Sequence, residues 1–110
     1  MDRMTNYKQI VRREVQQYFD RYYGDDQYAY LLLDDNTGNY LVLLNGWRAD
    51  ERLQAVNMYV RVSDGLIWIE EDWSDYVIVD HLIDAGVPQD KIVLAFHHPS
   101  DRPFTEFAVA

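Results

Sequence analysis

The chain has 110 residues, about the size of one ordinary globular domain, so we expect a single domain over residues 1–110. It carries 10 basic and 19 acidic residues, a formal net charge of −9, which argues against direct nucleic-acid binding because such affinity comes mainly from Lys and Arg. The absence of cysteine excludes disulfides and thiolate chemistry, and the absence of an apolar run of about 20 residues indicates a cytoplasmic protein without membrane contact.

Apolar residues at spacings of three and four predict an amphipathic helix from about Asn6 to Tyr23. Thr5 is a suitable N-cap, and Gly24 ends the pattern. The apolar stripe consists of Tyr7, Val11, Val15, Tyr18 and Tyr22, and the solvent face carries Gln9, Arg12, Arg13, Gln16 and Asp20.

Two strands are predicted next, as a hairpin. The first runs from Gln27 to Asp34 and is apolar on both faces, which favours a central place in the sheet. A turn at residues 35–38 leads to the second strand, from Tyr40 to Leu44, and Gly46 and Trp47 are expected to end it.

Two further strands complete a predicted antiparallel meander. The third strand has alternating apolar residues at Val56, Met58, Val60 and Val62. After a tight turn at residues 63–65, the fourth strand runs from Leu66 to Glu70. Leu66, Trp68 and Glu70 should face one side, and Ile67 and Ile69 the other.

A second helix is predicted after the meander, with an apolar face made by Ile78, Val79, Leu82, Ile83 and Ala85. Asp75 is a suitable N-cap, and Gly86 a suitable residue beyond the C-terminus. A short buried strand is expected at Ile92 to Phe96 and another at Thr105 to Val109. The whole pattern predicts an α+β fold with an N-terminal helix, a four-stranded meander, a second helix and one or two C-terminal strands.

Four sequence motifs, in this order, resemble a known family over nearly the whole chain. They are Asn45-Gly46-Trp47 followed by Arg52; Asp64-Gly65 leading to Ile67-Trp68-Ile69; Ala85-Gly86-Val87-Pro88 with Ile92-Val93-Leu94; and Phe96-His97 followed by Arg102-Pro103-Phe104-Thr105-Glu106-Phe107-Ala108-Val109-Ala110. The chain resembles the cyanobacterial XisI family of fdxN element excision controlling factors. Leu66 stands where the family often has Lys, and Tyr59 where His is common.

The resemblance implies an α+β domain that acts with a companion, the nuclease-like protein XisH, in controlling a site-specific DNA excision. It supplies no catalytic residues. The partner-binding residues that we predict are Trp47, Arg52, Trp68, His97, Arg102, Phe104, Glu106 and Phe107. A homodimer is a further possibility, and no cofactor is expected.

Two histidines in the C-terminal part are candidates for acid–base chemistry. Imidazole is a common general acid or base, and Asp101 could orient His97 or His98, which leaves a hydrolase open as an alternative. The structural alternative is that one His hydrogen-bonds the backbone near Pro99.

Charged clusters allow two alternatives. Carboxylates at 25–26, 34–35 and 70–72 could hold Mg²⁺ or Ca²⁺, although residues 34–38 lack the Gly and Glu positions of a calcium loop, and solvated turns explain them equally. Lys8, Arg12 and Arg13 are the only basic cluster that could contact a phosphate backbone.

Two modes of action remain open. The first is an accessory protein that binds the companion through its sheet and its C-terminal tail, where Phe104 and Phe107 are apolar anchors. The second is an acidic inhibitor that imitates nucleic acid and occupies the companion's basic groove.

Overall fold

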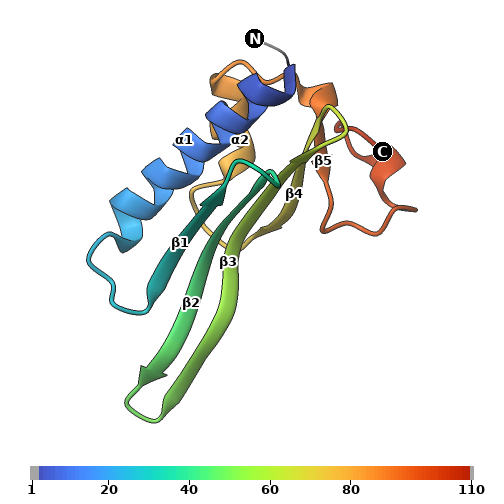
Figure 1. Ribbon diagram of the computed structural model, residues 1–110. Coiled ribbons are helices and arrows are strands. Elements are labelled where there is room, and N and C mark those ends of the chain that lie inside the picture. Colours follow the sequence, from blue (N-terminus) through green and yellow to red (C-terminus); the bar gives the residue numbers. More distant parts are fainter. Residues whose placement is uncertain (1–2, 110) are drawn as a thin grey trace.

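Two helices lie on one face of a five-stranded sheet in the computed structural model, which describes residues 3–109 (Figure 1). The strands follow one another across the sheet in chain order, β1-β2-β3-β4-β5. The first four pair antiparallel and the last pairs parallel to its neighbour. The α+β prediction is therefore confirmed.

Helix α1 (Arg3–Tyr23) carries the apolar stripe that the sequence predicts. Tyr7, Val11, Val15 and Tyr18 are buried, whereas Tyr22 is 53% exposed. The helix ends before Gly24 as expected. The Thr5 N-cap prediction is wrong, because the helix already includes Arg3 and Thr5 lies inside it.

Strands β1 (Ala29–Asp34), β2 (Asn39–Arg48), β3 (Glu51–Ser63) and β4 (Leu66–Asp72) form the predicted meander. The central place predicted for β1 is wrong, since β1 is an edge strand. Its second apolar face does not contact another layer: Tyr30 is 49% and Leu32 44% exposed.

Strands β2 and β3 are longer than predicted and extend beyond their neighbours as a two-stranded arm (Figure 1). Gly46 and Trp47 do not end β2 but lie within it. Gly46 has a φ of +141°, and a Cβ there would approach the Tyr28 ring to 2.7 Å, so the close packing of that ring requires glycine. The pairing of β2 with β3 shifts register between Val42 and Leu43.

Helix α2 (Ile78–Asp84) begins differently from the prediction. Asp75 is not its N-cap, because the helix starts after Val77, and the N–H of Ile78 donates to Asp72 Oδ2 at 2.9 Å. The C-terminal prediction is confirmed: Gly86 follows the helix with a φ of +103°.

Strand β5 (Ile92–Leu94) is shorter than predicted and pairs parallel to β4. It follows a short 3₁₀ helix, η1 (Gln89–Lys91), and a second one, η2 (Arg102–Phe104), lies in the C-terminal segment. The strand predicted at Thr105 to Val109 is wrong. This segment makes one isolated bridge, between Ala108 and Val93.

The core lies between the helices and the strand faces that they cover. Its strand residues are Tyr40, Val42, Met58, Val60, Val62, Ile67, Ile69 and Ile92. Ile78 and Leu82 of α2 join the same cluster. Of the helices described within residues 3–109, none is long and apolar enough to cross a membrane.

The turn between β1 and β2 allows a test of the packing. Gly38 has a φ of +73°, and a Cβ there would lie 2.5 Å from the carbonyl oxygen of Val62, whereas Gly65 has a similar φ of +77° with nothing within 4 Å. We expect Gly38→Ala to lower the free energy of unfolding by about 2 to 4 kcal/mol and Gly65→Ala by about 1 kcal/mol, because only the first adds a steric clash to the backbone strain. Urea denaturation of the two variants measures the difference. Equal losses would contradict the packing at Gly38.

Candidate functional site

The face of the sheet opposite the helices is uncovered along β1, β2 and β3, and we call this face, together with Trp68 of the neighbouring strand β4, the open face. Because side chains alternate along strands and the buried residues face the helices, their neighbours belong to this side. The open face contains Tyr30, Leu32, Leu41, Leu43, Val56, Tyr59, Arg61 and Trp68. None of these side chains is part of the core cluster. The fold thus presents a second apolar sheet surface to solvent.

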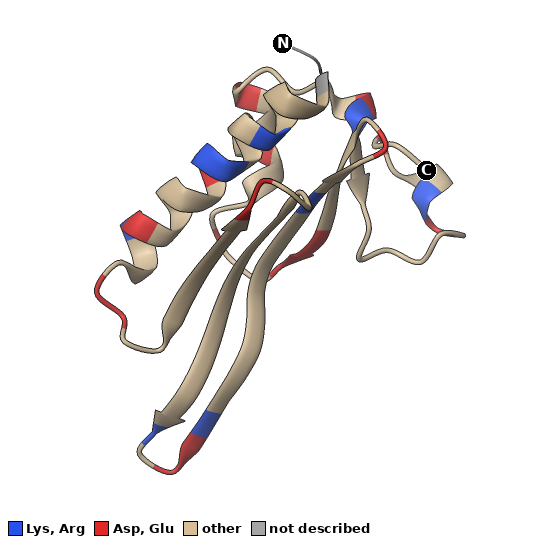
Figure 2. Cartoon of the chain, in the orientation of Figure 1, with Lys and Arg blue, Asp and Glu red and all other residues tan. Residues whose placement is uncertain are grey.

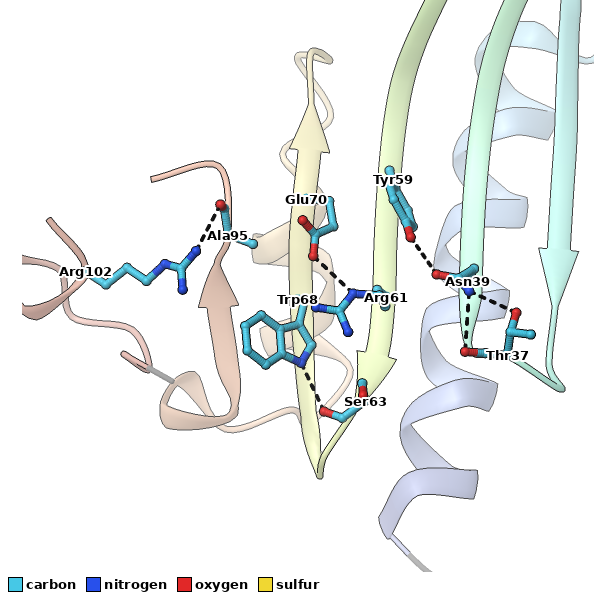
Figure 3. A network of polar contacts seen from close by, with 9 residues as sticks. All are labelled: Thr37, Asn39, Tyr59, Arg61, Ser63, Trp68, Glu70, Ala95 and Arg102. Carbon is cyan, nitrogen blue, oxygen red and sulfur yellow. Dashed lines mark hydrogen bonds and ion pairs between the residues drawn. The ribbon is translucent and has the colours of Figure 1, made fainter. Parts of the chain in front are cut away.

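A network of polar contacts fixes the side chains on the β3–β4 part of the open face (Figure 3). Arg61 Nε donates to Glu70 Oε2 at 3.1 Å, and its guanidinium lies 4.7 Å from the centre of the Trp68 ring. Trp68 donates its indole N–H to the carbonyl of Ser63 at 3.0 Å. Trp68 is therefore held in one orientation, which reduces the conformational entropy that a partner would have to remove on binding.

The open face continues onto the arm. Trp47 and Arg52 are cross-strand neighbours, and the Arg52 guanidinium lies 5.6 Å from the Trp47 ring centre. Arg52 also donates to the carbonyl of Gly46 and to Asn45 Oδ1, both at 3.2 Å. Trp47 is 61% exposed. The motif that these residues form in the sequence is thus one cross-strand unit near the tip of the arm.

Five of the predicted site residues lie in the C-terminal segment, beside β5. Arg102 donates to the carbonyls of His97 and Ala95 at 3.1 and 3.2 Å, and Glu106 accepts from the side chain of Gln89 at 3.1 Å. Phe107 packs against the core, whereas Phe104 is 89% exposed. The structure therefore brings His97 and Arg102 together, but it leaves Trp68 on the sheet and Trp47 with Arg52 on the arm.

The histidines do not form the acid–base pair that the alternative required. The His98 Nδ1 accepts the backbone N–H of Ser100 at 3.1 Å and lies 2.8 Å from its Oγ. Asp101 contributes its backbone N–H to the carbonyl of His98 instead of orienting the ring. The expected hydrogen bond of one His to the backbone near Pro99 is confirmed.

The charged clusters have structural partners. Asp34 accepts the hydroxyl of Thr37 and the backbone N–H groups of Thr37 and Asn36, and these hydrogen bonds, that of the Thr37 hydroxyl first, lower the pKa of Asp34. Within residues 3–109, no group of three His, Asp or Glu side chains is arranged to hold a metal ion. In the basic cluster, Arg12 pairs with Asp35 at 3.0 Å and Arg13 with Glu14 at 3.3 Å.

An aromatic pocket of about 330 Å³ between α1 and the β4–α2 connection was not found from the sequence. The Tyr18 ring lies 5.2 Å from that of Tyr76 and 5.5 Å from that of Tyr22, and its hydroxyl donates to Asn57 at 2.6 Å. Burial first, and then the neighbouring Tyr23, raise the pKa of Tyr18. The sequence does contain two aromatic groups, at residues 18, 22 and 23 and at residues 73 and 76. Only the tertiary structure brings the two groups together.

These features define a small α+β protein with surfaces suited to contact with other molecules. The model of the family described as XisI protein matches residues 1–109, and the chain belongs to this family. The resemblance predicted from the motifs is thereby confirmed.

Two solved structures support the assignment. The fdxN element excision controlling factor XisI from Anabaena variabilis is 39% identical, with a TM-score of 0.88, and the alignment covers 99% of this chain and all of that one. An XisI-like protein from the same organism is 27% identical, with a TM-score of 0.89 and coverage of 97% and 99%. No curated protein matches the chain.

Two buried tyrosines, Tyr40 in the core and Tyr18 beside the aromatic pocket, allow a test of the packing at alkaline pH. Burial and the hydrogen bond from its hydroxyl to Asp35 raise the pKa of Tyr40, and burial raises that of Tyr18. Above about pH 10 the unfolded chain loses these protons and the folded chain keeps them, so the free energy of unfolding falls as pH rises, by up to about 1.4 kcal/mol per pH unit for each group. Tyr40→Phe and Tyr18→Phe should each reduce this slope, measured by urea denaturation at a series of pH values. Slopes equal to that of the unmodified chain would show that folding does not raise the pKa of these two tyrosines.

Proposed function

We propose that the chain is an excision controlling factor that acts by binding a nuclease-like companion of the XisH type through the open face, without chemistry of its own. The observation that carries the proposal is the open face itself, an apolar sheet surface that no helix covers. Membership of the XisI family and the 39% identical excision controlling factor support the biological setting.

The composition of the open face supports a protein partner. Exposed apolar patches that are bordered by polar groups are typical of protein interfaces, and Tyr, Trp and Arg are the residues that contribute most at their centres. Arg61 and Trp68 are cross-strand neighbours on β3 and β4, and Tyr59 lies two residues from Arg61 along β3 (Figure 3). Tyr59 pairs with Leu41 of β2. Such a surface suits a polypeptide better than it suits a phosphate backbone.

The acidic inhibitor is the less favoured mode of action. A protein that imitates nucleic acid needs carboxylates in a regular exposed row, whereas the acidic residues of this chain are spread over helices, strands and turns (Figure 2). Glu70 and Asp35 are paired with arginines, and Asp34 and Asp72 accept backbone N–H groups. These carboxylates stabilise local structure.

A pair of matched variants tests the proposal. Leu32 on the open face and Ile83 on α2 are exposed to similar extents, 44% and 37%, on opposite sides of the sheet. We expect Leu32→Lys to weaken the complex with the companion at least about tenfold, because a lysine ammonium would have to be desolvated in the interface, and Ile83→Lys to leave the affinity unchanged. Titration calorimetry with the purified companion measures both affinities.

Three outcomes would count against the proposal. These are the absence of any complex at micromolar concentration, equal affinities of the two variants, and weakening by Ile83→Lys alone. Inhibition of the companion's nuclease activity that fades with increasing salt and is insensitive to Leu32→Lys would instead support the acidic inhibitor.

A further inference from the structure

Three adjoining hollows meet where the parallel strands β4 and β5 both end. Their volumes are about 330, 370 and 180 Å³, and each of Asp72, Trp73, Ser74 and Phe96 lines two of the three. We call this surface the Trp73 site, defined by Tyr22, Asp72, Trp73, Asp75, Val77 and Phe96. It contains none of the residues that define the open face.

The Trp73 site exposes more apolar surface than a short connection usually does. Trp73 is 76%, Phe96 54%, Tyr22 53% and Val77 42% exposed. Tryptophan is normally mostly buried, and contiguous exposed apolar groups mark interaction sites.

The connection that carries Trp73 is held in place by hydrogen bonds. The backbone N–H of Trp73 donates to the carbonyl of Asn57 at 3.0 Å. Asp72 accepts the backbone N–H groups of Ser74 and Ile78, both at 2.9 Å. The exposed indole is therefore presented from a fixed backbone.

Val77 adds an independent observation. It has φ and ψ of 53° and 76°, a left-handed conformation that a β-branched residue adopts only where the surrounding structure imposes it. Strained residues of this kind are concentrated at binding and catalytic sites. Val77 lines one of the three hollows, next to Phe96.

The charge of the Trp73 site selects the kind of ligand. The ionisable side chains that line the three hollows, apart from tyrosines, are Glu71, Asp72 and Asp75, and all are acidic. Aromatic faces beside carboxylates favour an organic cation, and arginine is the side chain that most often stacks on such faces. The chain itself gives an example nearby, because the guanidinium of Arg21 lies 5.4 Å from the Tyr22 ring centre.

We infer that the Trp73 site binds an arginine-containing segment of a polypeptide partner, with the guanidinium against Trp73 and the carboxylates, and apolar neighbours of the arginine against Phe96 and Val77. This goes beyond the proposed function, because it assigns a second binding surface that does not depend on the open face. The negative charge around the site opposes a nucleic acid as the ligand.

Nuclear magnetic resonance with a defined peptide tests the inference. The probe is the blocked peptide acetyl-Gly-Leu-Arg-Arg-Leu-Gly-amide, and its control replaces both arginines with citrulline, which has nearly the same shape without the charge. The three tryptophans of the chain give three indole N–H signals, so Trp47 and Trp68 serve as internal references. We expect the arginine peptide to shift the Trp73 signal and leave the other two in place, with an affinity at least about tenfold higher than that of the citrulline peptide.

Variants complete the test. Trp73→Ala should abolish binding of the arginine peptide, and Asp75→Asn should weaken it severalfold, whereas Trp47→Ala, which removes an exposed indole on the arm, should leave it unchanged.

Equal affinities for the two peptides would overturn the inference, as would equal shifts of all three indole signals. A Trp73 signal that moves on dilution without peptide would show that a second copy of the chain covers the site, and this would also overturn it. Leu32→Lys should not alter peptide binding, so failure of the proposed companion contact is distinguishable from failure of the Trp73 site.

Discussion

The packing of α1 and α2 against one face of the sheet is the constraint on which the rest of the structure depends. The buried stripe of α1 meets the inward side chains of the sheet, and α2 joins the same core through Ile78 and Leu82. Two helices cover only one side of a five-stranded sheet, so the other side of β1, β2 and β3 remains in contact with solvent. On this side the chain carries Tyr30 and Leu32 instead of the polar residues that a solvent-facing sheet usually has. The open face therefore consists of apolar side chains on a side of the sheet that is in contact with solvent.

The charges of the molecule act mainly at two levels. Locally, arginines pair with carboxylates across strands and between elements, and Asp34 and Asp72 accept backbone N–H groups at turns. Globally, the net charge of −9 disfavours nucleic acid and favours partners with basic surfaces. Under the proposed function, the protein would act on a DNA process by contact with another protein, and the negative charge fits that proposal.

Periodicity was enough to predict the helices and the meander, because each of these elements has its apolar residues at the spacing that its own geometry requires. It misplaced β1, since Tyr30 and Leu32 carry the same apolar signal whether a second layer covers them or a partner does. The sequence pattern predicts the end of β2 at Gly46, whereas Gly46 lies within the strand, where the Tyr28 ring, distant in sequence, packs against it.

The site was only partly predictable from the sequence. Trp47 with Arg52 could be identified as a motif, and the structure shows the cation–π pair that they form. The Trp73 site could not be predicted, because it joins residues of α1, of the β4–α2 connection and of the segment after β5, and only tertiary packing brings these together. Asp72 accepts the N–H of Ile78 although it lies six residues earlier in the chain. The sequence pattern predicts Asp75 instead, because Asp75 has the usual sequence position of an N-cap.

Under the proposed function, the open face is the surface through which the protein binds its companion. Hydroxyl-radical footprinting of the chain, alone and with its nuclease-like companion, tests it most directly, because the rate of side-chain oxidation reports solvent exposure residue by residue. We expect slower oxidation of Tyr30, Leu32 and Trp68 in the complex and an unchanged rate at Ile83. A complex in which the rates on the open face stay unchanged while those on the helical side fall would contradict it.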